Sequence, residues 1–268
     1  MLEHHYFTGT DISPRVAVNF TVTPGHVIRL GLSRAYRSPT FFEQEGNEVY
    51  VLQSGAVLDT VTVPSEGLEP ERVLSREIAY VGLWRRAGLE YDVRLFQDHI
   101  DNFIGQVKKD FVPDSTLRPN EFKYSNIGQV QSHGGELQLR WRPTPALDVS
   151  AHYARVFTRA ATSVINFNRD IPKSAPRDSW GGLANYRLGH GWETSMFVQR
   201  SSIQKWLSEG DTTKAFTRVD VRLARSWKWQ GHEVEAAVVG QNLGQNYQEF
   251  RDSNLFSRRV YSSLNLSW

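Results

Sequence analysis

The last twelve residues of the chain, Ser257 to Trp268, alternate between apolar and polar side chains. One register holds Val260, Leu264, Leu266 and Trp268, and the other holds Arg259, Tyr261, Ser263, Asn265 and Ser267. A period of two is typical of a β-strand with one apolar and one polar face. The same alternation recurs in segments such as 16–22, 137–142 and 218–223, and no helical period competes with it. The sequence therefore predicts an all-β chain, in which we count eleven strands.

The composition excludes several classes of protein. No apolar run approaches the ~18 residues of a membrane-spanning helix. Spanning strands are not excluded, because in a β-barrel the polar residues of the lumen side offset the apolar residues of the lipid side. The chain has 268 residues and no cysteine, so it has no disulfide framework and no thiolate chemistry. Its 31 basic and 29 acidic residues are scattered along the chain and do not suggest a nucleic-acid partner.

The connections between the expected strands alternate in length. Short turns such as Thr23-Pro24-Gly25 and Gly189-His190-Gly191 alternate with long polar loops at roughly 37–72, 104–122, 158–175, 207–214 and 243–257. This is typical of an up-and-down outer-membrane barrel and places Trp268 at the short-turn, periplasmic rim. An aromatic girdle is expected at that rim from Trp84, Trp141, Trp192, Trp227 and Trp229, with Trp180 and Trp206 near the opposite rim. A soluble β-sandwich with tryptophan at its strand ends is the alternative.

Four short motifs occur in an order that resembles the TonB-dependent outer-membrane receptors, of the siderophore-receptor type. The first lies at the entry to a long loop and comprises Tyr36, Arg37, Pro39, Thr40 and Glu43. The others are Leu68-Glu69-Pro70-Glu71 with Glu77, Asn126 to Gln129 with Gly135-Glu136-Leu137, and Gln241-Asn242-Leu243 with Tyr247. The terminal Val260, Leu264, Leu266 and Trp268 resemble the signal read by the barrel-assembly machinery.

The resemblance implies a transmembrane antiparallel β-barrel, of which residues 1–268 would supply about 11 of 22 strands as its C-terminal half. The signal peptide and plug domain are expected to be absent, since residues 1–5 lack the basic and apolar regions of a signal peptide. An odd strand count closes poorly, and an open sheet exposes two unpaired edges to lipid. We therefore expect a truncated fragment that does not function alone.

The partners that the resemblance implies are outer-membrane lipid, the barrel-assembly machinery and, only through the absent plug, the TonB system. The ligand would be an iron–siderophore, although cobalamin, haem, another metal chelate or a glycan would fit equally well. Within this family, the loop-entry motif either fixes the strand exit and the loop packing or contacts the ligand, and Pro39 restricts both itself and Ser38.

The sequence predicts no catalytic, metal or cofactor site. The His-x-Ser arrangement of outer-membrane phospholipase A does not occur, and residues 150–152 carry the reverse order. His4 and His5 are interpreted as part of an exposed tail rather than a metal pair. The charged residues of the lumen side come in mixed signs and are expected to cross-link neighbouring strands. Three functions remain: part of a TonB-dependent receptor, which we prefer, a passive porin-like or oligomeric pore, and a barrel hydrolase.

Overall fold

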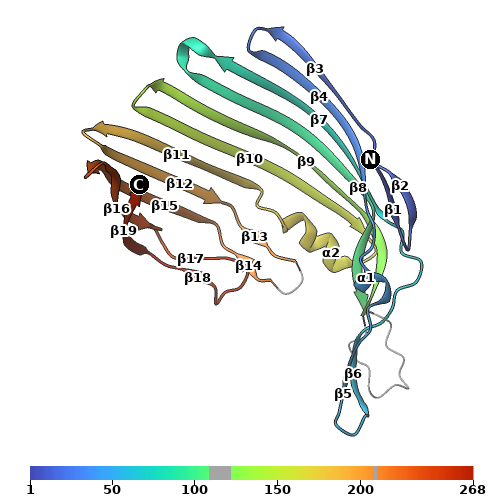
Figure 1. The fold of residues 1–268 in the computed structure, drawn as a ribbon. Coiled ribbons are helices and arrows are strands. Elements are labelled where there is room, and N and C mark those ends of the chain that lie inside the picture. The colour runs from blue at the N-terminus through green and yellow to red at the C-terminus, as the bar shows by residue number, and fades with distance from the viewer. Residues whose placement is uncertain (109–121, 208–209, 268) are drawn as a thin grey trace.

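The computed structural model describes residues 1–108, 122–207 and 210–267, and it shows one curved antiparallel sheet (Figure 1). Eleven strands form the main path of the sheet, and each pairs with its neighbours along the chain. This confirms the predicted strand count and the up-and-down order. The strands are β3 (Arg15–Thr23), β4 (His26–Arg37), β7 (Glu71–Trp84), β8 (Leu89–Lys108), β9 (Phe122–Thr144), β10 (Leu147–Thr162), β11 (Asp178–Gly189), β12 (Trp192–Ser201), β15 (Phe216–Trp229), β16 (His232–Gln241) and β19 (Arg259–Ser267).

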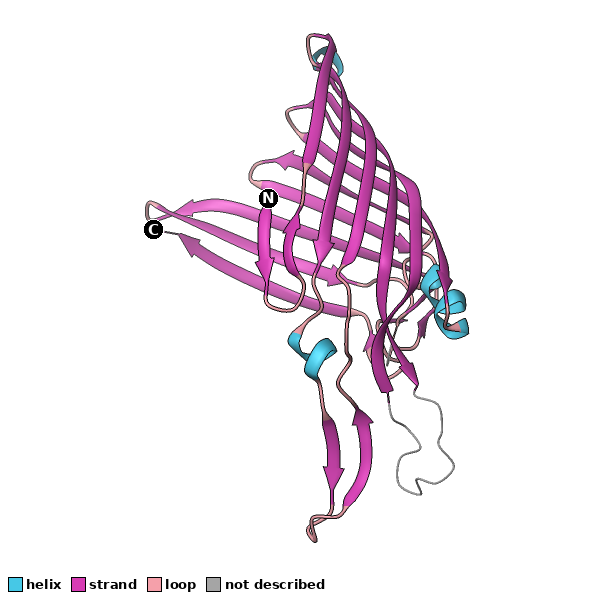
Figure 2. Ribbon diagram, turned by 90° about the vertical axis from the view of Figure 1, so that its right-hand side faces the viewer, coloured by secondary structure: helices cyan, strands magenta, loops and turns pink. Residues whose placement is uncertain are grey.

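The long connections contain short elements that the sequence did not reveal. Elements of two to six residues are too short to show a period. The hairpin of β5 (Glu48–Val51) and β6 (Val57–Thr62) projects well beyond the sheet (Figure 2). The other elements are helices α1 (Phe41–Glu45) and α2 (Ile165–Asp170), 3-10 turns at Arg85–Ala87 and Ile171–Lys173, and strand pairs β1 (Leu2–His5) with β2 (Gly9–Ile12), β13 (Gln204–Lys205) with β14 (Thr212–Thr213), and β17 (Tyr247–Gln248) with β18 (Leu255–Phe256).

Two sequence interpretations change in these peripheral segments. His4 and His5 lie in strand β1, opposite Thr10 and Gly9, so the expected tail is an ordered strand pair, in which His4 is exposed and His5 is half-buried. Trp206 donates a hydrogen bond from Nε1 to Thr213 and packs edge-on against Phe250 within the loop region, so it does not extend the aromatic band of the sheet. No helix in the described part of the chain is both long and apolar enough to cross a membrane.

The register separates the sheet into two faces. Residues opposite one another on paired strands share a face, and one such row runs from Ile28 through Tyr80, Val93, Leu137 and Tyr153. We call this side the apolar face. The side chains between them form the polar face, where the Arg94 guanidinium pairs with Glu136 and lies 3.7 Å from Glu77. All five tryptophans assigned to the girdle (Trp84, Trp141, Trp192, Trp227 and Trp229) lie on the apolar face beside the short turns, and each is more than a third exposed.

The turn residues account for the short connections. His190-Gly191 and Gln230-Gly231 all have positive φ angles, between 51° and 86°. Positive φ at both central positions is the conformation of a type I′ turn, whose twist matches that of the strands it joins. These turns gather at one rim of the sheet, and the helices and the β5–β6 hairpin gather at the other (Figure 1). We call the latter the long-loop rim.

The sheet does not close on itself. Along the main path, β3 pairs only with β4, and β19 pairs only with β16. Every neighbouring pair between them is antiparallel, so with eleven strands the two edge strands run in the same direction. Within the described residues, the backbone groups along these two edges have no partner strand on the outer side.

The register predicts opposite tolerance at two adjacent positions of β15. Val221 lies on the apolar face between Met196 and Gly240. Arg222 lies on the polar face, with Glu235 at 2.7 Å and Glu193 at 3.5 Å. Val221→Arg should cost about 2–4 kcal/mol if this face meets lipid near the bilayer midplane, whereas Arg222→Ala should be mild if water on the polar face solvates the two glutamates. The yield of folded protein in detergent measures the effect of each substitution. A lower yield for Arg222→Ala than for Val221→Arg would contradict the register.

Candidate functional site

The loop-entry motif lies where β4 reaches the long-loop rim and the chain turns into α1. Thr40 caps this helix: its side-chain oxygen accepts a hydrogen bond from the Glu43 backbone N–H at 3.1 Å, and the Glu43 carboxylate accepts one from the Thr40 N–H at 2.7 Å. Such a reciprocal capping box satisfies two backbone donors that a helix start leaves free. Pro39 is fully buried beside it. The motif therefore sets where the strand ends and the helix begins.

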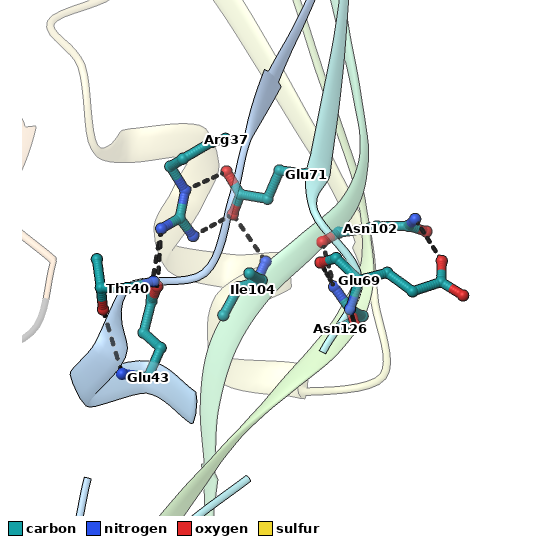
Figure 3. Close-up of polar contacts among 8 residues, drawn as sticks. All are labelled: Arg37, Thr40, Glu43, Glu69, Glu71, Asn102, Ile104 and Asn126. Atoms are coloured by element: carbon teal, nitrogen blue, oxygen red, sulfur yellow. Dashed lines mark hydrogen bonds and ion pairs between the residues drawn. The ribbon is translucent and has the colours of Figure 1, made fainter. Parts of the chain in front are cut away.

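Arg37 joins this cap to the neighbouring strands (Figure 3). Its Nε and one terminal nitrogen donate to the two Glu71 oxygens at 2.7 and 2.9 Å, and its other terminal nitrogen donates to Glu43 at 2.9 and 3.1 Å. Glu71 also accepts a hydrogen bond from the Ile104 backbone N–H at 2.8 Å. We call Arg37, Thr40, Glu43, Glu71 and Ile104 the ion-pair cluster. It ties together the ends of β4, α1, β7 and β8.

The electrostatics of the cluster favour the charged forms of its members. Burial alone would raise the pKa of Glu43, but the hydrogen bonds from Arg37 and from the Thr40 backbone hold that pKa below its ordinary value. The pKa of Arg37 is raised, chiefly by its hydrogen bond to Glu71. One guanidinium is shared by two carboxylates, so its donors are engaged within the protein. This arrangement fastens structural elements and leaves no free nucleophile or base for catalysis.

A second group of contacts lies on the neighbouring strands. The Asn126 side chain donates to the backbone oxygens of Glu69 at 2.9 Å and Asn102 at 2.7 Å, and it accepts from the Glu69 N–H at 2.9 Å. Asn102 in turn donates to the Glu69 carboxylate at 2.7 Å. We call these three residues the amide cluster. It holds the segment before β7 against the irregular stretch of β8 and β9, where the register shifts after Ile100.

The fourth motif organises the connection from β16 to β19. The Asn242 backbone N–H donates to Asp220 at 2.8 Å, and its side chain donates to the Phe256 carbonyl at 2.8 Å. The Tyr247 ring is stacked between Phe216, at a centroid distance of 4.3 Å, and Phe256, at 5.1 Å. This motif therefore also fastens a loop to a strand end.

The predicted site residues do not all come together. Arg37, Thr40 and Glu43 meet in the ion-pair cluster, whereas Tyr36 lies on the opposite face of β4, opposite Arg72. Val260, Leu264 and Leu266 lie on the apolar face of the edge strand β19, and all three are exposed. Trp268 lies outside the described residues.

Five residues of these clusters were not among the predicted sites. Glu69 and Glu71 belong to the second motif and Asn126 to the third, so their place in the motif order was the signal that pointed to them. Ile104 contributes only its backbone N–H. Asn102 carries no sequence signal: its φ of 57° and its position at a strand irregularity appear only in the structure.

The polar face contains hollows but no metal centre among the described residues. One hollow of about 910 Å³ is lined by residues of β7 to β12, with Leu83, Leu183 and Phe197 beside Asp92 and His152. In the part of the chain that the structure describes, no three histidine, aspartate or glutamate side chains are grouped to hold a metal ion.

The family comparison matches nearly the whole chain. A family model described as "TonB dependent receptor-like, beta-barrel" matches residues 3–243. A search of curated proteins returns no match.

Several solved structures share the fold at low sequence identity. A mutant of the ferric enterobactin receptor PfeA from Pseudomonas aeruginosa is 14% identical, with a TM-score of 0.73 over 99% of this chain and 41% of that one. The siderophore receptor PirA from Acinetobacter baumannii is 13% identical, with a TM-score of 0.71 over 98% of this chain and 42% of that one. The copper transporter OprC is 14% identical, with a TM-score of 0.64 over 95% and 40%. The chain thus spans about two-fifths of the length of these proteins.

Removing the central arginine of the ion-pair cluster should loosen the long-loop rim. Arg37→Ala leaves Glu71, whose side chain is only 9% exposed, with one backbone donor. Because Arg37 is itself 42% exposed, we expect a local loss of about 1–2 kcal/mol. Hydrogen exchange of the amides in α1 and at the rim end of β7 measures it. Arg72→Ala, which breaks the exposed pair with Asp101 on the opposite face, is the matched control and should cost less. Equal effects would contradict a fastening role for Arg37.

The cluster should also weaken in acid. Because the folded-state pKa of Glu43 lies below its ordinary value of 4.5, its contribution is present above that value and is lost as the pH falls through the lowered pKa. Protection of the α1 amides from hydrogen exchange should therefore decrease below about pH 4.5. The Glu43→Gln variant cannot titrate at this position. Its α1 amides should therefore be less protected from exchange at neutral pH, and their protection should change less in acid. An acid response as large in the variant as in the parent would contradict this assignment.

Proposed function

The chain belongs to the TonB-dependent receptor β-barrel family. From this premise we propose that it forms part of the wall of an outer-membrane transporter, which takes up a scarce ligand through the TonB system. Receptors and transporters of this family are not enzymes, so the hydrolase alternative no longer applies. We further propose that residues 1–268 correspond to the C-terminal portion of the barrel.

The observation that carries the proposal is the charge distribution on the apolar face. Between the short turns and the middle of each described strand, this face carries one charged residue, Arg225, whose guanidinium lies over the Trp192 ring at 5.4 Å near the short-turn rim. Spanning strands need about 9–11 residues, and β10, β11, β12 and β15 reach that length. A continuous apolar band with tryptophan at one border is the pattern expected of a lipid-facing wall.

The open edges favour a larger barrel over a passive pore made of copies of this chain. Unpaired backbone groups in lipid cost several kcal/mol each, so both edges need partner strands. A second copy in the same membrane orientation would bring β19 beside β3 as a parallel neighbour, because the two strands run in the same direction. Bacterial barrels close with antiparallel strands and even counts. We infer that an odd number of further strands completes this sheet, which agrees with 11 of a presumed 22.

The ligand proposal is an iron–siderophore. It is supported by the similar fold of PfeA, described as a ferric enterobactin receptor, and of PirA, described as a siderophore receptor. The similarity to the copper transporter OprC keeps other metal cargoes as alternatives. Since the polar face forms the barrel interior in this proposal, the hollow lined by β7 to β12 would lie along the route of the ligand or against a plug. TonB would act through that plug and not through this chain directly.

We propose roles for two further sets of predicted residues. Trp84, Trp141, Trp192, Trp227 and Trp229 would form the periplasmic aromatic girdle, because an amphipathic ring prefers the headgroup level. The apolar row of Val260, Leu264 and Leu266, with Trp268, would be the signal bound by the barrel-assembly machinery.

Uptake in a defined strain tests the proposed function. The polypeptide that carries this chain is produced in a strain lacking its own ferric-siderophore receptors, and growth on a panel of ferric siderophores is measured under iron limitation. We expect growth on at least one siderophore with TonB and none without it. Residues 1–268 produced alone serve as the control and should give neither growth nor ion conductance. Conductance from that chain alone, or uptake without TonB, would establish the passive pore instead.

Deleting Trp268 tests the assembly proposal. The deletion should reduce insertion into the outer membrane of cells more than it reduces folding in detergent, because only the former needs the assembly machinery. Membrane fractionation and a detergent folding assay give the two values, with Trp229→Ala as the control for loss of an aromatic ring. If membrane insertion and detergent folding decrease equally, Trp268 contributes to packing alone.

A further inference from the structure

A row of hydroxyl groups with one carboxylate crosses the polar face below the long-loop rim. Its members lie opposite one another on β4, β7, β8, β9 and β10, and they are Ser33, Ser75, Asp98, Ser132 and Thr158. The Ser75 hydroxyl donates a hydrogen bond to the Asp98 carboxylate, and the hydroxyl oxygens of Ser132 and Thr158 are 3.0 Å apart. We call these five residues the hydroxyl row. Because a hydroxyl group can donate and accept, the row offers hydrogen bonds of both kinds.

On these five strands, the hydroxyl row and the two rows beside it contain no basic side chain. The row nearer the rim consists of Ala35, Val73, Ile100, Val130 and Ala160, and the row nearer the short turns consists of Gly31, Glu77, Phe96, Gly134 and Val156. Arg15 extends the hydroxyl row onto β3, where its guanidinium lies 3.9 Å from Glu77. Between β4 and β10, the charged groups of these three rows are therefore the carboxylates of Glu77 and Asp98.

The guanidinium groups on either side of these rows are held by carboxylates. Toward the rim, Arg37 is shared between Glu43 and Glu71 (Figure 3). Toward the short turns, Arg94 pairs with Glu136. The donors of both arginines are thus directed at groups of the protein itself.

Asp98 has no such partner. In the described part of the chain, its carboxylate is hydrogen-bonded to the Ser75 hydroxyl and forms no ion pair. Arg29 lies two rows further toward the short turns and donates to Asn19 at 3.2 Å. An anion at the hydroxyl row would therefore meet a carboxylate and no unpaired guanidinium. Like charges repel more strongly where little water screens them, so this part of the wall disfavours anions.

The hollow of about 910 Å³ continues this character toward the short turns. Its two carboxylates, Glu90 and Asp92, form no ion pair within the described residues, and its guanidinium, Arg140, lies 2.7 Å from Asp148. Gln138 adds a neutral hydrogen-bonding group to the lining. In the proposed function the polar face is the barrel interior, so a ligand entering at the long-loop rim would pass the hydroxyl row and then reach this hollow.

Ferric chelates differ in the charge that such a wall would meet. Three hydroxamate groups carry one negative charge each, so their complex with Fe³⁺ has no net charge. Three catecholate groups carry two negative charges each, so their complex with Fe³⁺ keeps three. Binding an anion away from water is unfavourable unless a cation pairs with it. The charges of this wall therefore suit the hydroxamate complex and oppose the catecholate complex.

We propose that the hydroxyl row and the hollow beside it contact an uncharged chelate, a ferric tris-hydroxamate, and that Asp98 excludes polyanionic chelates. The proposal rests on the iron–siderophore uptake proposed above. Ser33, Ser132 and Thr158 donate to carbonyl oxygens of the ligand, and the Asp98 carboxylate accepts from its amide N–H groups. Asp98 is thus a specificity-determining residue on this part of the wall.

The test uses the polypeptide that carries this chain, purified in mild detergent. Its affinities for a neutral peptide ferric tris-hydroxamate and for ferric enterobactin, a tris-catecholate, are measured by quenching of tryptophan fluorescence. We expect the tris-hydroxamate to bind at least about tenfold more tightly. The affinity for it should also change little with ionic strength, because an uncharged ligand has no net Coulomb interaction to screen.

A charge reversal tests the role of Asp98. The Asp98→Lys variant replaces a repulsive charge by an attractive one, so it should reduce the preference for the tris-hydroxamate by at least about tenfold. Glu233→Lys is the matched control, because Glu233 lies on the polar face opposite Lys228 at the short-turn rim and the substitution changes the charge equally. It should leave the preference within about twofold of that of the parent protein.

The outcomes separate this inference from the proposed function. Binding of ferric enterobactin, or of another anionic ferric chelate, at least as tightly as the tris-hydroxamate overturns the inference, and no variant is needed to establish it. An Asp98→Lys variant that is folded, as shown by its circular dichroism, and keeps the preference of the parent also overturns it. In both cases siderophore uptake stands. If the parent protein binds no ferric chelate, the iron–siderophore proposal fails and the inference fails with it.

Discussion

The rest of the structure depends on one constraint, which is that a wall surrounded by hydrocarbon must satisfy every backbone hydrogen bond within the protein. An antiparallel ladder of eleven strands does this across the interior of the sheet, and it divides the side chains into an apolar and a polar face. The same constraint makes β3 and β19 the weak points, because each lacks a neighbour on one side. The proposal that further strands cover these edges in the membrane therefore rests on backbone chemistry as well as on the family.

Polar side-chain clusters occur at both rims, as the pairing of Asp148 with Arg140 and Arg142 shows for the short-turn rim, but those at the long-loop rim join segments far apart in the sequence. At the short-turn rim the chain reverses within a few residues, and the side chains of Trp141 and Arg187 donate to the turn carbonyls of Ala87 and Pro145. At the long-loop rim the strands end at different heights, and side chains replace the missing ladder bonds. Arg37, Glu71 and Asn126 do so by joining segments that are 24 to 57 residues apart in the sequence. All four sequence motifs contribute fastenings of this kind, so their spacing reflects strand length and register more than ligand chemistry.

Much of the fold could be predicted from the sequence, because period-two alternation and turn residues are local signals. The strand count, the order of the strands and the face of Val221 or Trp84 all follow from them. The clusters could be predicted only in part. Arg37 and Glu43 were identified by the motif, but the contact between Arg37 and Glu71 depends on strand pairing, and Asn102 depends on a register shift. The row that Arg76 shares with His133 and Phe157 was also hidden, because only strand pairing brings these residues of β7, β9 and β10 into line.

The central claim is that the apolar face meets lipid while the polar face meets water, and the absence of cysteine from the chain makes it directly measurable. Single cysteines are placed in turn at positions 217 to 223 of β15, and each is labelled with a nitroxide in the membrane-embedded protein. The label reports how accessible its position is to oxygen and to a water-soluble nickel chelate. The account predicts a period of two, with oxygen favoured at Val219, Val221 and Leu223 and the chelate favoured at the positions between them. Accessibility without alternation, or chelate access on the apolar face, would contradict it.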